Sequence, residues 1–150
     1  MSKAGTIPFE TSHHVRDACL CLHVQRTARA LARRFDDAFR PLDLTSGQFS
    51  LLVSLNRAAA PSIGSVASLL AMDRTTLTAA LKPLERRGLI DVRIDAKDRR
   101  TRLLKLTPKG RALLSRAVPI WKKTHTALEK QLAGADPDRL RNDLHVLAGV

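Results

Sequence analysis

The sequence is poor in aromatic and in acidic residues. Only five of its 150 residues are aromatic, four Phe and one Trp, and there is no Tyr. A protein that binds single-stranded nucleic acid by stacking bases on a row of rings needs more rings than this. The 14 acidic residues stand against 26 Lys and Arg, and the formal net charge of +12 predicts a polyanionic partner. Double-stranded DNA is therefore the first partner to expect.

Long apolar runs are also missing. None approaches the roughly 20 residues that cross a bilayer. The stretch 1–10 has neither the charged start nor the apolar middle of a signal peptide. We therefore expect a cytoplasmic protein with no membrane partner, whose cysteines, Cys19 and Cys21, are thiols. With 44% hydrophobic residues, the chain can form one folded domain with a core.

Recognisable catalytic motifs are absent as well. No Gly-rich phosphate loop, nucleophile elbow or paired-histidine zinc motif occurs, so we expect no enzyme, no catalytic residue and no cofactor. His13 with Asp17, and His125 with Glu129, have a spacing that suits metal ligands, but neither pair comes with a full ligand set. We expect ordinary surface or interface histidines and no metal site.

The positive charge is concentrated in the middle of the chain. Residues 73–111 hold twelve basic and five acidic residues, which is +7 of the net charge of +12. A charged, solvated face would explain such a run by itself. The order of the elements predicted within it indicates a more specific role.

Helical patterns occupy both ends of the chain. Thr11 or Ser12 is a suitable N-cap for a long helix that ends at about Arg40. Further helices are expected to begin after the caps Thr107 and Asp136. Apolar residues at alternating spacings of three and four form one stripe on the first helix: Cys21, Val24, Ala28, Leu31, Phe35, Ala38 and Leu42.

Three shorter helices and a hairpin are predicted between these ends. Thr45 or Ser46 is expected to cap a helix over 48–57, and Ser65 a helix over 66–72.

The next helix is expected over 74–87, capped by Asp73 and ended by Gly88. Residues 89–94 and 101–106 then predict a β-hairpin. Two short helices with a basic hairpin form a winged helix-turn-helix, so the fold class is mainly α with a small β-hairpin wing (α+β).

This arrangement suits duplex DNA. A helix about 10 Å across fits the major groove, which is ~12 Å wide. Thr can meet base edges, Arg can bond guanine bidentately, and the cations of the hairpin tip suit the minor groove. Free N–H groups at helix starts can hold phosphates. The candidate DNA-binding residues are Ser65, Arg74, Thr75, Thr76, Thr78, Lys82, Lys97, Arg99 and Arg100. A winged helix that binds another protein is the alternative.

At these residues the sequence resembles the MarR family of bacterial transcriptional regulators. The most specific likeness is the wing motif of residues 95–100 followed by Leu106-Thr107-Pro108-Lys109-Gly110. The other matching stretches are 44–49, 69–77 and 84–90. The likeness covers about residues 12–148. It also implies an ion pair between Asp73 and Arg100.

The resemblance implies a homodimer that reads a pseudo-palindromic operator and works at the nucleoid of a bacterial cytoplasm. It divides the chain into a DNA-binding lobe, 44–110, and a helical dimerisation region, 11–43 with 111–150. Family members commonly release DNA when a small aromatic or anionic molecule binds between the dimer helices and the lobe. The candidate lining of that site is His23, Arg26, Phe49, Arg57 and Trp121.

One branch of the family senses organic hydroperoxides through a cysteine in the first helix, and Cys21 falls in its register. The branch supports that cysteine with tyrosines, where this chain has Gln25 and Phe35. Without phenol hydroxyls a thiolate would lack hydrogen bonds that activate it. Cys21 also lies on the apolar stripe, which favours a buried structural cysteine. Cys19 and Cys21 face different directions and are not expected to bridge.

The sequence thus predicts a transcriptional regulator, most simply a repressor, that binds a specific duplex site and is released by a small ligand. A thiol-based redox sensor acting through Cys21 is one alternative. The other is an architectural DNA-binding protein without site preference, which would share the charge but leave no bounded footprint.

Overall fold

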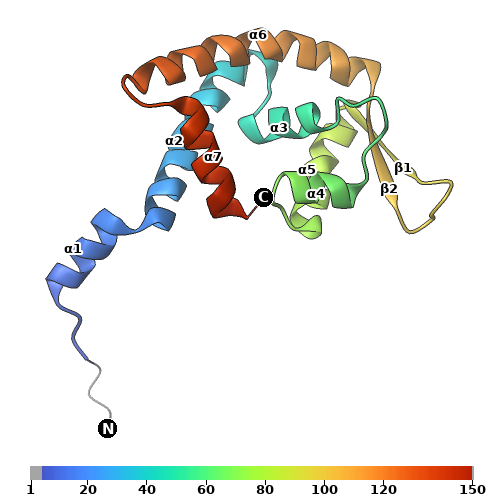
Figure 1. The fold of residues 1–150 in the computed structure, drawn as a ribbon. Coiled ribbons are helices and arrows are strands. Elements are labelled where there is room, and N and C mark those ends of the chain that lie inside the picture. The colour runs from blue at the N-terminus through green and yellow to red at the C-terminus, as the bar shows by residue number, and fades with distance from the viewer. Residues whose placement is uncertain (1–4, 150) are drawn as a thin grey trace.

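A computed structural model describes residues 5–149 (Figure 1). Its elements confirm the predicted class, mainly α with one β-hairpin. In chain order they are α1 (Phe9–Ala18), α2 (Leu20–Phe39), the short 3-10 helix η1 (Arg40–Leu42), α3 (Ser46–Ser54), α4 (Ile63–Leu69), α5 (Arg74–Arg86), β1 (Ile90–Ile94), β2 (Arg102–Leu106), α6 (Pro108–Gln131) and α7 (Pro137–Ala148). Over the described range, no helix is both long and apolar enough to cross a membrane.

The predicted first helix is two helices. Cys19 has an extended backbone, φ −71° and ψ 107°, and separates α1 from α2. Since α1 begins at Phe9, Thr11 and Ser12 lie inside it, and the prediction that either caps the helix was wrong. No residue of α1 is buried, so no packing holds it in line with α2.

The first helix of the central segment begins as predicted. Thr45 accepts a hydrogen bond from the Gln48 N–H at 3.2 Å, and the Gln48 side chain accepts one from the Thr45 N–H at 3.1 Å. This capping box satisfies two donors that the helix leaves free. The helix α3 ends at Ser54, earlier than predicted.

The helix α4 begins one turn before its predicted cap. Ser62, rather than Ser65, is the N-cap, and its hydroxyl accepts a hydrogen bond from the Ser65 N–H at 3.1 Å. The Ser65 hydroxyl donates to the Ser62 carbonyl. Gly64 therefore lies inside the helix and not in the loop before it.

The core lies between the end of α2, the helices α3 to α5, the hairpin and the first half of α6. Its largest fully buried side chains are Phe39, Leu52, Val66, Leu77, Leu84, Leu89, Ile90 and Leu104. The strands β1 and β2 are antiparallel, with Ile90 opposite Leu106 and Ile94 opposite Arg102. The Leu104 N–H donates to the Pro61 carbonyl, which joins the hairpin to the segment before α4.

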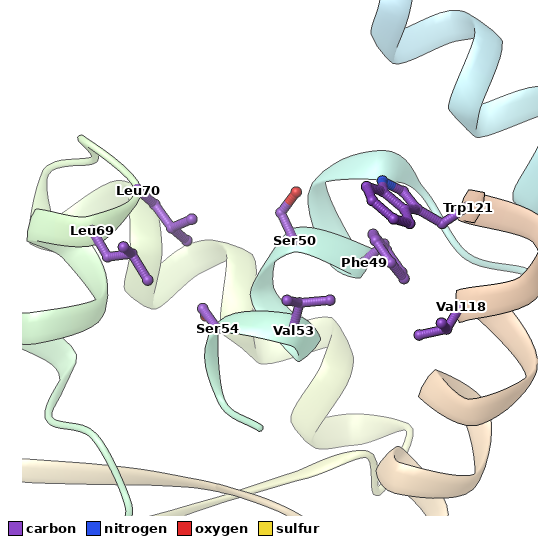
Figure 2. Close-up of a pocket in the computed structure, with 8 residues that line it drawn as sticks. All are labelled: Phe49, Ser50, Val53, Ser54, Leu69, Leu70, Val118 and Trp121. Atoms are coloured by element: carbon purple, nitrogen blue, oxygen red, sulfur yellow. The ribbon is translucent and has the colours of Figure 1, made fainter. Parts of the chain in front are cut away.

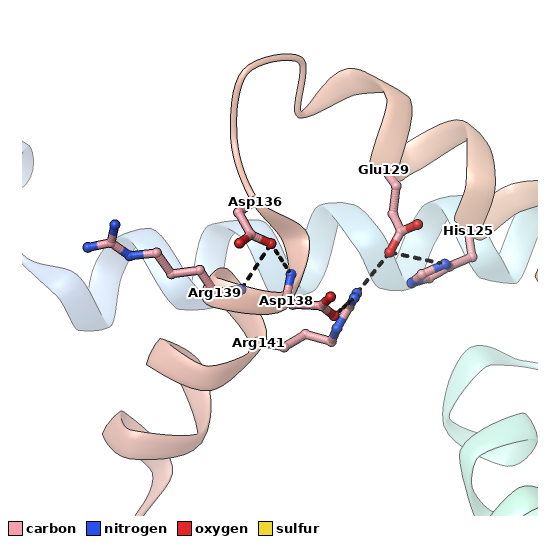
Figure 3. Close-up of polar contacts among 6 residues, drawn as sticks. All are labelled: His125, Glu129, Asp136, Asp138, Arg139 and Arg141. Atoms are coloured by element: carbon pink, nitrogen blue, oxygen red, sulfur yellow. Dashed lines mark hydrogen bonds and ion pairs between the residues drawn. The ribbon is translucent and has the colours of Figure 1, made fainter.

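The helix α6 crosses the molecule above this lobe, and α7 turns back from the end of α6 (Figure 1). An ionic cluster holds this corner (Figure 3). Arg141 donates to Glu129 at 2.9 Å and to Asp138 at 2.5 Å, and His125 Nδ1 lies 3.8 Å from the same Glu129 oxygen. Hydrogen bonds to these two carboxylates raise the pKa of Arg141 above its ordinary value, and Asp138 contributes more than Glu129.

The terminal helices leave apolar side chains uncovered. These are Phe9 and Val15 on α1, Leu20, Val24 and Leu31 on α2, and Leu140, Leu144, Val146 and Leu147 on α7. The apolar stripe of the first helical region therefore packs against the core only near its end, at Phe35 and Leu42.

Candidate nucleic-acid interface

The helix α5 has one buried and one exposed face. Leu77, Leu81 and Leu84 are buried in the core. The candidate contacts of this helix all lie on its exposed side: Arg74, Thr75, Thr76, Thr78 and Lys82. The helix begins at its predicted cap, Asp73, and the chain leaves it through Gly88 with φ +68°.

The threonines of that face differ in what their hydroxyls do. The Thr76 hydroxyl donates to Asp73 at 2.6 Å, and the Thr78 hydroxyl donates to the Arg74 carbonyl at 2.8 Å. Neither proton is free for a base edge. Thr75 makes no such bond among the described residues, so its hydroxyl is the one available both to donate and to accept.

Two acidic residues shape the tip of the wing. Asp95 accepts a hydrogen bond from the Lys97 N–H at 3.0 Å. Asp98 accepts from the Arg100 N–H at 3.0 Å and from the Thr101 hydroxyl at 3.1 Å. Because these carboxylates bind the backbone of the turn, they fix the turn and leave its cations exposed. Those cations are Lys97, Arg99 and Arg100.

The ion pair expected between Asp73 and Arg100 is not formed. Both oxygens of Asp73 are occupied at the cap, one by the Thr76 N–H at 2.8 Å and the other by the Thr76 hydroxyl. These bonds hold the pKa of Asp73 below its ordinary value, and the bond from the Thr76 hydroxyl has the largest effect. Arg100 instead lines a recess with Arg74 and Thr78.

Several cations of the basic segment support the backbone. Arg87 donates to the Asp43 carbonyl at 2.6 Å, Lys109 to the Arg87 carbonyl at 2.8 Å, and Arg111 to the Leu106 carbonyl at 2.9 Å. Part of the positive charge of residues 73–111 thus holds the lobe together. Conversely, exposed Arg102 at the start of β2 lines the same recess as Arg74, and the prediction from sequence missed it. Alternation along the strand places Arg102 on the same face as buried Leu104, so the sequence pattern gave no signal that Arg102 would be exposed.

A second candidate site is an apolar pocket of about 460 Å³ (Figure 2). It lies between α3, the end of α4 and the middle of α6. Its lining is Phe49, Ser50, Val53, Ser54, Leu69, Leu70, Val118 and Trp121. The rings of Phe49 and Trp121 are stacked with centroids 6.5 Å apart, and Trp121 also stacks on His125 at 4.7 Å.

The five residues predicted to line a ligand site are not all brought together. Phe49 and Trp121 share this pocket. His23 and Arg26 lie on an exposed face of α2, and Arg57 lines a separate recess near Arg111. The prediction missed Val53 and Leu69, which are large apolar residues with 45% and 57% of their surface exposed.

Cys21 is exposed in this chain and not buried as the apolar stripe predicted. Cys19 is also free. The Gln25 amide donates to Cys21 Sγ at 3.2 Å, and Arg29 donates to the Gln25 amide oxygen at 3.2 Å. Arg29 thus orients the amide so that its nitrogen faces the sulfur. A hydrogen-bond donor is present where the missing tyrosines predicted none.

Known proteins similar to this chain are transcriptional regulators. The organic hydroperoxide resistance transcriptional regulator of Bacillus subtilis is 30% identical over 128 residues, which are 85% of this chain and 86% of that protein. The HTH-type transcriptional regulator TtmR of Methylorubrum extorquens is 31% identical over 89% of this chain and 71% of its own length.

A solved structure extends the likeness to the whole fold. The crystal structure of the M. tuberculosis transcriptional regulator MosR in complex with DNA is 36% identical. It covers 87% of this chain and 94% of its own, with a TM-score of 0.78. The MarR family model matches residues 44–101, which span α3 to the turn of the wing. The chain belongs to the MarR family and is a DNA-binding transcriptional regulator.

Proposed function

We propose that this protein is a repressor that binds a pseudo-palindromic operator as a homodimer and leaves it when a small aromatic ligand binds. The observation that carries the DNA-binding part is the exposed face of α5 beside a wing tip whose cations are held outward by Asp95 and Asp98. A recognition helix and a basic wing on one lobe fit the major groove and an adjacent minor groove.

The dimer is supported by the uncovered apolar faces of α1, α2 and α7. Such a surface is larger than isolated apolar residues on a monomer and is typical of an interface. We assign dimerisation to residues 11–43 and 111–150, and DNA binding to residues 44–110. Two lobes joined in this way would reach two major grooves one turn, ~34 Å, apart.

The ligand site is supported by the pocket of Figure 2. Its volume of about 460 Å³ lies within the roughly 300–1,000 Å³ of small-molecule sites. Its lining holds two aromatic rings and no charged side chain, which favours a neutral aromatic ligand over an anion. Trp121 belongs to the proposed dimer region and Val53 to the DNA-binding lobe. An occupant that separates them would alter the spacing of the two lobes.

Footprinting on DNA beside the protein's own gene tests the DNA-binding part. We expect a bounded, palindromic footprint. Protection that spreads over any duplex would contradict the proposal and support an architectural role.

A pocket-filling variant tests the ligand part. An aromatic compound that releases the wild type from its operator should fail to release Val53→Trp, because the new indole occupies the pocket. Ala133→Trp adds the same bulk at an exposed residue after α6 and should release like the wild type. Equal release from both variants would rule out this pocket.

The contact of Gln25 with Cys21 favours a second candidate, a thiol sensor of organic hydroperoxides. In that reaction the Cys21 sulfur takes one peroxide oxygen to become a sulfenic acid, and the alcohol leaves. Peroxide should then release the wild type and Cys19→Ser from DNA but not Cys21→Ser. Equal release of all three would exclude Cys21.

A further inference from the structure

Arg74, the first residue of α5, lies against Gly64 in the first turn of α4. A β-carbon at Gly64 would lie 2.8 Å from Arg74 Nη2, 3.4 Å from its Cζ and 3.7 Å from its Nε. The guanidinium group therefore rests on the bare Cα of Gly64. We call the space beside the Gly64 Cα the Arg74 seat. The side chain of any larger residue would fill this space, so the absence of a side chain at position 64 sets the direction of Arg74.

This seat directs Arg74 into a recess of about 260 Å³ between α4, α5 and the wing. Arg100 and Arg102 line the same recess, together with the hydroxyl-bearing Thr78 and Thr101. No carboxylate lines it, and none of the three guanidinium groups has a carboxylate partner within the described residues. Like charges that converge without an acid repel one another, and an anion between them would relieve this repulsion.

We propose that this recess binds one phosphate group of the DNA backbone, and that Gly64 positions Arg74 for that contact. The inference rests on the proposed DNA binding and changes the role of Arg74 from reading a guanine to holding a phosphate. Arg74 leans onto α4 and faces the wing, where its planar fork and those of Arg100 and Arg102 suit phosphate oxygens. Base reading on α5 is left to Thr75.

The two roles of Arg74 give different results with Arg74→Ala. A phosphate contact carries no sequence information. Its loss should weaken binding about tenfold, both to a selected site and to a scrambled duplex. It should also lower the salt slope, which is the steepness with which log K falls with the logarithm of the salt concentration, by about one per chain. A base contact predicts instead a loss confined to the selected site and a relaxed preference at one base pair, and that result would overturn the proposal.

The seat itself is tested with Gly64→Ala. Alanine suits a helix better than glycine, and its methyl meets only the movable end of Arg74, so the variant should fold. We expect binding to both duplexes to weaken about threefold, and the double variant with Arg74→Ala to bind no more weakly than Arg74→Ala alone. The matched control is Gly47→Ala in α3, where a β-carbon meets nothing within 4 Å.

Two results would overturn the proposal that Gly64 positions Arg74. The first is a Gly64→Ala variant that binds DNA like the wild type. The second is a loss of affinity from Gly64→Ala that is equally large in the Arg74→Ala background. Both are read from fluorescence anisotropy across a salt series, with thermal unfolding as the check on folding. If the wild type binds the selected and scrambled duplexes equally, site-specific regulation fails. The slopes on the scrambled duplex still decide the phosphate contact.

Discussion

Gly110, in the first turn of α6, packs its Cα onto the carbonyl group of Leu89, and a β-carbon at this position would overlap the Leu89 oxygen. That oxygen also accepts a hydrogen bond from the Thr107 N–H at 3.1 Å. The obstacle is backbone and not the end of a flexible side chain. The base of the wing and the start of α6 are therefore fixed to each other at this point.

Gly110→Ala should consequently destabilise the fold. Either α6 or the residue before β1 must move, and overpacking of this kind costs about 1–3 kcal/mol. Urea unfolding followed by circular dichroism measures the free energy of unfolding. Gly47→Ala, with open space around its β-carbon, is the matched control. Equal stability of the two variants would mean that the backbone at Leu89 moves away at no measurable cost in free energy.

Arg99→Ala should weaken DNA binding without regard to sequence. Arg99 is exposed at the wing tip, and the neighbouring Asp98 is engaged by the Arg100 N–H and Thr101. Removing the charge of Arg99 should lower the salt slope of DNA binding by about one per chain. Lys130→Ala removes an equal charge at an exposed residue far along α6 and should change little. An unchanged slope for Arg99→Ala would place Arg99 outside the interface.

Thr75→Val should alter which operator sequences are preferred. The Thr75 hydroxyl makes no bond to its own helix among the described residues, whereas the Thr78 hydroxyl donates to the Arg74 carbonyl. Selection of binding sites from a random duplex pool would show the change. Thr78→Val is the matched control and should keep the wild-type preference. A uniform loss of affinity with Thr75→Val would contradict a base-reading role.

Thr76→Val should raise the pKa of Asp73. The Thr76 hydroxyl, more than the N–H groups of the cap, holds that pKa below its ordinary value. A lowered pKa in the folded state means that the charged cap stabilises the fold above the ordinary carboxyl pKa. This contribution is lost as the pH falls through the lowered value.

Carboxyl NMR during an acid titration measures this pKa directly. Thr75→Val keeps the hydroxyl of Thr76 and should leave the pKa of Asp73 in place. If Thr76→Val also leaves it in place, the hydroxyl is not the principal cause.

Capping chemistry made much of the lobe predictable from sequence. Asp73 with Gly88 bounded α5, and Thr107 with Pro108 began α6, because these residues satisfy free backbone groups or supply a positive φ locally. The break at Cys19 left no such signal, since it needs neither proline nor glycine.

Long-range contacts account for the other differences. The helix predicted over 66–72, with Ser65 as its cap, left Gly64 outside any helix, as is usual for an isolated glycine near a proline. In the structure a β-carbon at Gly64 would meet the guanidinium group of Arg74, ten residues later. The cap of Asp73 likewise removed the partner expected for Arg100. A periodic pattern contains no information on such pairings.

Because Trp121 stacks between Phe49 and His125 at the pocket, its fluorescence can report whether the pocket is occupied. Trp121 is the sole tryptophan and the chain has no tyrosine, so its intrinsic fluorescence comes from one indole at the wall of the pocket. An occupant of the pocket should shift or quench that emission. Occupancy can thus be followed without a label, before any operator is known.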